Sequence, residues 1–221
     1  MNYLTQQLLN SDELEILRNN LDKEELFWED GKHTAGKHAA KVKNNLQLRR
    51  DSDLSKKFSE LIKKKILSND LIKSFALPKK VHGTIISKST SGMKYGRHID
   101  NAFMSSGRAD LSFTIFLNSK DKYEGGALSV ECFDSEKKFK LDAGEIIIYP
   151  STFLHSVEEV FAGERLVFIG WIESYVKSIE EREYLFDLDA AARSLLTKYG
   201  RSDEVDLIFK SYSNLLRRLG S

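Results

Sequence analysis

Apolar residues near the start of the chain recur every three or four positions. This spacing covers residues 14–21, which follow Ser11 and two acidic residues, and it appears again over residues 54–66. Because such spacing places apolar side chains on one face of an α-helix, both segments are predicted to be amphipathic helices, the first with its N-cap at Ser11. A turn-rich stretch at residues 30–36 leads into residues 42–48, for which we expect one short strand.

From about residue 80 the pattern changes to short runs of β-branched and aromatic residues. Turn-forming segments at residues 118–126 and 142–144 separate several of these runs. Regular short strands of this kind predict an antiparallel sandwich or barrel. The expected strands are residues 81–86, 111–117, 127–130, 138–141, 145–149 and 165–171.

Helical spacing returns after Trp171, over residues 184–196 and 205–216. Gly200 separates the two segments, and glycine is common at the C-terminal end of a helix. The second helix carries one apolar stripe, which either pairs with a second subunit in a homo-oligomer or caps the chain's own barrel. This stripe consists of Val205, Ile208, Phe209, Tyr212 and Leu216.

The length of 221 residues suits one large domain, or one domain with a small appendage. The 34 basic and 33 acidic side chains nearly balance, and no block of like charge is longer than residues 63–65. This charge pattern lacks the basic cluster that binding to nucleic acid or an anionic membrane requires. No apolar run approaches the roughly 20 residues that cross a bilayer, and residues 1–10 lack the pattern of an export signal. We therefore expect small molecules and proteins as partners, with no nucleic acid and no membrane.

Cys132 is the single cysteine of the sequence. One cysteine cannot form an internal disulfide or a thiolate-based metal site, and it favours a reducing compartment, so we expect a cytoplasmic protein. A bound metal would need histidine and carboxylate ligands. The candidates among the histidines are His33, His38, His82, His98 and His155.

Two of these histidines occupy positions suited to a metal. His98 and Asp100 are two positions apart, so in an extended segment both side chains point to the same face. His155 follows one predicted strand and precedes another, where an antiparallel barrel returns the chain to the place it left. Two histidines and one carboxylate can form a facial triad on Fe(II) that leaves positions open for a co-substrate and dioxygen. The other three histidines are expected to have structural or surface roles.

Arg165 begins the last strong predicted strand. Strand alternation places it on the same face as Val167, Ile169 and Trp171, so a charged group enters an apolar strand and requires a partner. A guanidinium forms two parallel hydrogen bonds with a carboxylate. A dicarboxylate whose other end chelates the iron would be such a partner.

Several aromatic residues are candidates either for the core or for a substrate channel. We expect core positions for Trp28, Phe113 and Trp171. Phe103 lies just past the triad in a loop rich in glycine and serine, residues 101–107, and is expected to line the channel. This loop is a candidate lid.

The order of histidine, aspartate, distal histidine and downstream arginine resembles the iron(II)- and 2-oxoglutarate-dependent dioxygenases. Residues 95–101 and 123–128 are similar to the prolyl-hydroxylase-type subgroup. Five further segments are similar to the bacterial PKHD-type hydroxylases, a family that includes proteins associated with iron uptake. These segments are residues 30–36, 42–45, 108–112, 149–151 and 212–217, so the resemblance runs nearly end to end.

The resemblance implies an α+β fold. Its core would be a double-stranded β-helix, or jelly roll, that forms one domain with flanking N-terminal helices over residues 1–175. A C-terminal helical extension would follow over residues 176–221.

The resemblance also implies a ligand set and a reaction. By position, His98, Asp100 and His155 would bind Fe(II), and Arg165 would bind the distal carboxylate of 2-oxoglutarate, with L-ascorbate as a cofactor that re-reduces the iron. Dioxygen and 2-oxoglutarate would be consumed, succinate and CO2 released, and an unidentified substrate hydroxylated. That substrate is a peptide or protein side chain or a small metabolite, and the family's association with iron uptake suggests a link to iron homeostasis.

One position departs from the animal prolyl hydroxylases. They often have a tyrosine, whose hydroxyl helps bind the co-substrate, where this chain has Phe116, which cannot donate a hydrogen bond. Thr114 or Tyr95 is the expected replacement donor. The substrate therefore need not be a prolyl residue.

Two other classes of protein use similar residues. A non-oxidative cupin-like metalloprotein could hold Zn(II) or Mn(II) with the same triad, but it would not need Arg165. A non-catalytic module that senses iron or 2-oxoglutarate would keep every site residue and lack turnover. Because Asp100 fills the position that a halide takes in related halogenases, hydroxylation is expected in place of halogenation.

Overall fold

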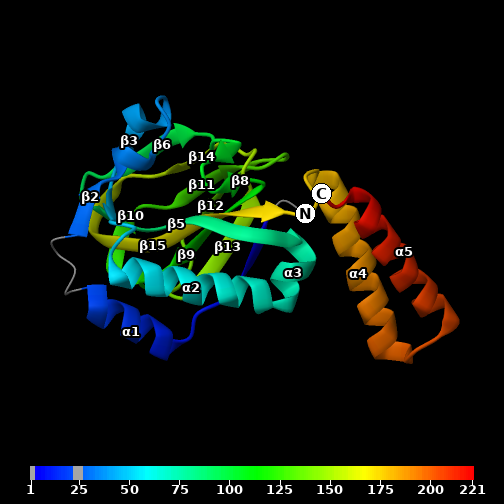
Figure 1. Ribbon diagram of the computed structural model, residues 1–221. Coiled ribbons are helices and arrows are strands. Elements are labelled where there is room, and N and C mark those ends of the chain that lie inside the picture. The colour runs from blue at the N-terminus through cyan, green and yellow to red at the C-terminus, as the bar shows by residue number, and fades with distance from the viewer. Residues whose placement is uncertain (1–2, 22–26) are drawn as a thin grey trace.

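The computed structural model of the protein describes residues 3–21 and 27–221. Two antiparallel sheets face each other at its centre, three helices lie against one sheet, and a pair of helices forms the C-terminal end (Figure 1). This arrangement confirms the predicted α+β class and the antiparallel sandwich. All strand pairs of the two sheets run antiparallel within the described residues.

The larger sheet contains eight strands in the order β1-β13-β9-β15-β5-β4-β2, with β10 paired to β15 outside this path. The long strands β5 and β15 pair with each other at its centre. The bounds are β1 Leu4–Gln7, β2 Trp28–Asp30, β4 Leu46–Leu48, β5 Pro78–Thr90, β9 Leu111–Phe116, β10 Tyr123–Gly125, β13 Glu145–Pro150 and β15 Val160–Ser174.

The smaller sheet contains five strands in the order β12-β11-β14-β6-β3. A separate hairpin, β7 with β8, follows β6 in the chain. The bounds are β3 Lys43–Asn44, β6 Lys94–His98, β7 Phe103–Met104, β8 Gly107–Arg108, β11 Leu128–Glu131, β12 Glu136–Phe139 and β14 His155–Val157.

Helices α1, α2 and α3 cover the outer face of the larger sheet, and α4 and α5 form the C-terminal pair (Figure 1). The predicted N-cap at Ser11 is wrong by one residue. Asn10 accepts a hydrogen bond from the backbone of Glu13, whose carboxylate accepts one from the backbone of Asn10, so the capping box begins one position earlier. The bounds are α1 Ser11–Leu21, α2 Asp53–Ser68, α3 Asp70–Ala76, α4 Ile179–Tyr199 and α5 Asp203–Leu219, with short 3-10 helices η2 Gly31–Thr34, η3 Ala39–Val42 and η4 Lys120–Lys122.

The larger sheet separates two hydrophobic cores, as the alternation of β13 shows. Ile146 and Ile148 pack toward the helices, whereas Ile147 and Tyr149 pack toward the smaller sheet. Successive side chains of a strand point to opposite faces, so a run with no polar residue serves both cores. The inter-sheet core stays partly open, and this opening is the cavity described below.

The single strand expected at residues 42–48 is wrong. The structure divides this segment into β3, which pairs with β6 in the smaller sheet, and β4, which pairs with β5 in the larger sheet. Asn45 lies between them, with its side-chain amide donating to Ser87 Oγ. The chain therefore crosses from one sheet to the other here and closes one side of the cavity.

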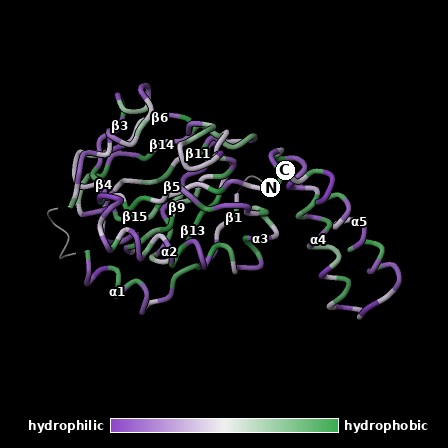
Figure 2. The backbone as a smooth tube through the Cα atoms, viewed as in Figure 1, coloured by the Kyte–Doolittle hydropathy of each residue, from purple (hydrophilic) through white to green (hydrophobic). Residues whose placement is uncertain are grey.

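The C-terminal helices pack on each other and on the end of the jelly roll. Tyr212 and Leu216 of α5 pack with Leu185 of α4 and with the buried residues Leu77 and Val176. Figure 2 shows hydrophobic and hydrophilic segments alternating along both helices. Part of the predicted stripe is therefore used within the chain, and its pairing with a second subunit stays a prediction. No helix within residues 3–21 and 27–221 is long and apolar enough to span a membrane.

Candidate metal centre and cavity

His98, Asp100 and His155 meet where the central strands β6 and β14 of the smaller sheet end and begin. His98 ends β6 and His155 begins β14, and the two residues are direct partners in the register of these strands. One ligand atom from each of the three side chains lies within 4.8 Å of the other two. The sequence prediction that these residues share one site is consistent with this geometry.

Backbone carbonyls fix the orientation of both imidazole rings. His98 Nδ1 lies 2.8 Å from Gly96 O, and His155 Nδ1 lies 3.0 Å from Phe153 O. A carbonyl oxygen can only accept, so Nδ1 must carry the proton in each ring. The unprotonated Nε2 atoms are therefore free as metal ligands, and His155 Nε2 lies 3.7 Å from Asp100 Oδ2. Such hydrogen bonds on the far ring nitrogen are typical of metal-binding histidines.

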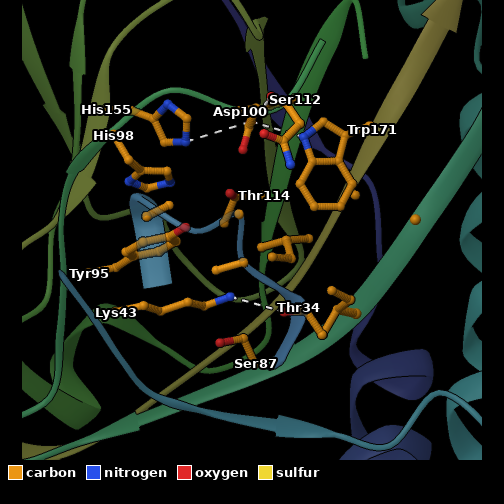
Figure 3. Close-up of a pocket in the computed structure, with 18 of the residues that line it drawn as sticks. Thr34, Lys43, Ser87, Tyr95, His98, Asp100, Ser112, Thr114, His155 and Trp171 are labelled. Atoms are coloured by element: carbon orange, nitrogen blue, oxygen red, sulfur yellow. Dashed lines mark hydrogen bonds and ion pairs between the residues drawn. The ribbon is translucent and has the colours of Figure 1, made fainter. Parts of the chain in front are cut away.

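Two side chains of the larger sheet hold the carboxylate of Asp100 in place. Its Oδ2 accepts hydrogen bonds from Ser112 Oγ at 2.6 Å and from Trp171 Nε1 at 2.9 Å. Ser112 also bonds to Ser151 Oγ. The carboxylate thus points from the loop after β6 toward the two histidines, as Figure 3 shows. The predicted core position of Trp171 needs correction, because its indole lines the cavity and bonds a site residue.

Two tyrosine rings pack against the histidines. The Tyr95 ring stacks on His98 with centroids 3.6 Å apart, and the Tyr149 ring meets His155 edge-on at 5.3 Å. Burial, together with the neighbouring His155, lowers the pKa of His98 to about 4. His98 is therefore neutral near pH 7, the state in which imidazole binds a metal.

Arg165 lies in β15 on the cavity wall and is 3% exposed. Its guanidinium lies 5.5 Å above the Phe116 ring, and its Nε has no hydrogen-bond partner within the described residues. Burial lowers the pKa of Arg165, an effect that the Tyr123 hydroxyl partly offsets. Gly126, at φ +64°, leaves room for the arginine stem, because a Cβ there would lie 3.1 Å from Arg165 Cδ.

A second buried cation lies on the same cavity, and the sequence patterns did not single it out. Lys43 of β3 is 5% exposed, and its Nζ donates to Thr34 Oγ1 at 3.1 Å. The ammonium lies 5.0 Å from the centroid of the Tyr95 ring. Burial lowers the pKa of Lys43 to about 8. The alternation of β3 alone does not indicate this position, because the strand has two residues.

The cavity has a volume of about 460 Å³, within the range of small-molecule sites. Thr114 and Tyr95 line it, as does Phe103, which is 74% exposed at the rim in the β7–β8 hairpin. His33 also lines it, beyond its predicted structural or surface role. His82 is structural, because its ring bonds Ser106 Oγ and Arg108 O at the base of the hairpin.

Comparison with solved structures supports the same fold. A prolyl-4-hydroxylase of Pseudomonas putida aligns with a TM-score of 0.58 and 18% identity, covering 78% of this chain and 92% of that one. A prolyl hydroxylase of Trichoplax adhaerens, in complex with a hypoxia-inducible-factor peptide fragment, aligns with a TM-score of 0.58 and 15% identity, covering 83% and 86%. At these identities the likeness concerns the jelly-roll fold, which confirms the fold expected from the sequence.

Sequence comparison defines the class. Residues 84–173 match the 2OG-Fe(II) oxygenase superfamily, and residues 180–220 match the PKHD-type hydroxylase C-terminal domain. The fold and these matches define an Fe(II)- and 2-oxoglutarate-dependent dioxygenase.

The particular family follows from full-length relatives. A PKHD-type hydroxylase of Prochlorococcus marinus strain MIT 9215 is 74% identical over 220 residues, and one of strain AS9601 is 68% identical over 221, each covering 100% of both chains. The chain belongs to the PKHD-type hydroxylase family, which confirms the resemblance found in the sequence.

Proposed function

We propose that His98, Asp100 and His155 hold Fe(II) and that Arg165 binds the distal carboxylate of 2-oxoglutarate during hydroxylation of a substrate C–H bond. One observation carries this proposal: a ligand atom from each of the three side chains lies within 4.8 Å of the other two. The Nδ1 atoms of both histidine rings are hydrogen-bonded to backbone carbonyls, which leaves the Nε2 atoms available to the metal. Two imidazoles and one carboxylate are the donor set of a facial Fe(II) triad. The residues present therefore fit the metal.

The bound iron and 2-oxoglutarate supply the oxidising chemistry, in which dioxygen is cleaved, 2-oxoglutarate becomes succinate and CO2, and one oxygen atom enters the substrate. The protein itself positions the metal ligands and the co-substrate. Ser112 and Trp171 orient the carboxylate of Asp100. Arg165, a buried guanidinium without a carboxylate partner among the described residues, offers two parallel donors to an incoming carboxylate.

We assign the replacement for the missing tyrosine hydroxyl to Thr114. It is buried on β9 and lines the cavity, and its hydroxyl has no hydrogen-bond partner among the described residues. Tyr95 instead lies flat on the His98 ring. Thr114 therefore donates to the co-substrate, and Tyr95 holds the histidine in place.

Anaerobic addition of Fe(II) and 2-oxoglutarate tests the proposed site. The chelate is expected to give a visible charge-transfer band in the wild type, and Asp100→Ala and His155→Ala are expected to lose it. His38→Ala is the matched control, because His38 is exposed and does not line the cavity. A wild type without the band, or a His155→Ala variant that keeps it, contradicts the assignment.

Succinate release in air then separates an enzyme from a module that only senses its ligands. We expect the wild type to convert 2-oxoglutarate to succinate slowly even without its substrate, and His155→Ala to show none. A sensing module would form the band and release no succinate. Comparing the reaction with and without ascorbate tests the expected role of ascorbate, which is to keep the iron reduced.

Three further assignments belong to this proposal. We infer a cytoplasmic location from the lone Cys132, and a link to iron homeostasis from the resemblance to proteins associated with iron uptake. We also divide the chain at residue 175, and the two family matches, which lie on either side of this position, support the division. Limited proteolysis that cuts first between residues 175 and 179 would agree with it, whereas first cuts inside the jelly roll would not.

A further inference from the structure

The cavity holds two buried cations, and the proposed function uses one of them. Arg165 and Lys43 both line the cavity, and they are 3% and 5% exposed. Neither forms an ion pair with a carboxylate among the described residues. Arg165 is assigned above to 2-oxoglutarate, so the ammonium of Lys43 is left without a role.

The surroundings of Lys43 leave part of its ammonium open. Figure 3 shows the side chain running below Tyr95 toward Thr34. The Thr34 hydroxyl takes one of the three ammonium protons, and the Tyr95 ring face lies 5.0 Å away. These neighbours solvate the cation without neutralising it. Asp100 and Asp30 favour its charge without forming an ion pair with it, and Arg50 opposes it.

The sum of charges in the site with Fe(II) and 2-oxoglutarate bound indicates the charge of the partner that Lys43 lacks. Fe(II) carries two positive charges and 2-oxoglutarate two negative ones, and Asp100 and Arg165 cancel each other. The positive charge of Lys43, a side chain that is 5% exposed, then remains without a negative partner. A buried charge is costly unless it is paired, so a ligand that brings one negative charge completes the site.

We propose that the ammonium of Lys43, whose position the Thr34 hydroxyl fixes by accepting one of its protons, binds a carboxylate of the molecule that this enzyme hydroxylates. The inference rests on the proposed function, because it takes Arg165 as the site for 2-oxoglutarate. The Thr34 hydroxyl donates its own proton to Gln47 Oε1 or Gly31 O, so the ammonium supplies the donors, and its single charge suits a monoanion, whereas a phosphate dianion needs further donors, such as an arginine fork. Arg50 also lines the cavity but is exposed and faces Glu29, so it does not supply that second charge.

Carboxylate binding can be measured without turnover. The protein is saturated with Zn(II) and 2-oxoglutarate, its lysine ε-carbons are labelled with carbon-13, and acetate is titrated while the lysine signals are followed by NMR. The Lys43 signal is the one that is absent in Lys43→Met and present in Lys41→Met. Lys41 is the matched control, because it is exposed two residues away and does not line the cavity.

We expect acetate to shift the Lys43 signal to saturation, and acetamide at the same concentrations to leave it unchanged. Lys41→Met should behave as the wild type does. A Lys43 signal that does not respond while both Zn(II) and 2-oxoglutarate are bound overturns the inference. So does a Lys43 signal that 2-oxoglutarate itself shifts and protects from acetate, because Lys43 would then serve the co-substrate. Failure to bind Zn(II) or 2-oxoglutarate would instead count against the proposed function.

The source of the carboxylate is identified in the same experiment. Three further compounds are titrated, each against its amide: N-acetylalanine for small acids, acetyl-Ala-Ala-Ala for peptide C-termini, and acetyl-Ala-Asp-Ala-amide for acidic side chains. The source is the compound with the lowest half-saturating concentration. Equal responses to each acid and its amide would overturn the inference.

Discussion

Trp171 Nε1 donates a hydrogen bond to Asp100 Oδ2 at 2.9 Å, joining a central strand of the larger sheet to the loop after β6. Trp171 lies at an irregularity in the pairing of β15 with β5, where Gly83 and Thr84 together oppose Gly170. Such bulges redirect a side chain and are frequent beside active sites. The extra residue here lies in β5, so β15 keeps its alternation, and Trp171 faces the cavity together with Arg165, Val167 and Ile169.

Trp171→Phe should weaken metal binding. The variant keeps an aromatic ring but cannot donate to Asp100, and loss of such an outer partner costs about 10- to 100-fold in metal affinity. The dissociation constant of Mn(II), measured by electron paramagnetic resonance, tests this. Trp28→Phe is the control, because Trp28 packs outside the cavity. Equal constants for Trp171→Phe and the wild type would show that the hydrogen bond does not position the carboxylate.

Gly83→Ala should disturb the same contact from the neighbouring strand. Gly83 has φ +66°, and a Cβ there would lie 2.6 Å from Trp171 Cε3. Gly92 has φ +79°, but a Cβ there meets no atom within 4 Å. Both alanines carry backbone strain of about 1–2 kcal/mol, whereas only Gly83→Ala should also lower Mn(II) affinity. The prediction fails if the two variants lose affinity equally.

Arg165→Met should raise the KM for 2-oxoglutarate. A hydrogen bond to a charged group contributes about 1.5–3 kcal/mol, which corresponds to roughly a 10- to 150-fold change. Succinate release at varied 2-oxoglutarate measures it. Arg97→Met is the control, because Arg97 is exposed and paired with Glu131. An unchanged KM would remove Arg165 from the co-substrate site.

Lys43→Met should stabilise the metal-free protein at pH 7. Burial lowers the pKa of Lys43 from 10.5 to about 8, so at pH 7 the folded state carries a cost of about 3 kcal/mol for the charge. Loss of the hydrogen bond to Thr34 offsets part of the gain, leaving about 1–2 kcal/mol.

The difference in the free energy of unfolding between Lys43→Met and the wild type should depend on pH. Between pH 8 and 10.5 the unfolded chain binds a proton that the folded chain lacks, so the wild type gains stability as the pH rises through this window. The advantage of Lys43→Met should therefore shrink toward pH 10.5. Urea unfolding of both proteins and of Lys41→Met at pH 7 and pH 10 checks this. A constant difference between the two pH values would contradict the prediction.

The four longer helices and the long strands follow from the sequence, because their patterns are local, whereas α3 and several short strands were not predicted. The helical spacing of residues 54–66 and the apolar run of residues 145–149 each have one favourable conformation once a core is available. The two-residue strand β3 and the short strand β14 carry no such pattern. They exist because β6 and β11 offer unpaired edges beside them.

The sequence by itself determined which residue types could form the site: a His-x-Asp pair, a distal histidine, and an arginine in an apolar strand. Their spacing along the chain, together with the resemblance, was enough to single out His98, Asp100, His155 and Arg165. Only the tertiary structure placed Trp171 on Asp100 and Lys43 on the cavity wall. Strand alternation puts Trp171 on the same face as Arg165, but its contact with Asp100 requires the loop after β6 to lie beside β15, and Lys43 reaches the cavity through the crossing between the two sheets. Both depend on long-range pairing, which leaves no periodic trace in the sequence.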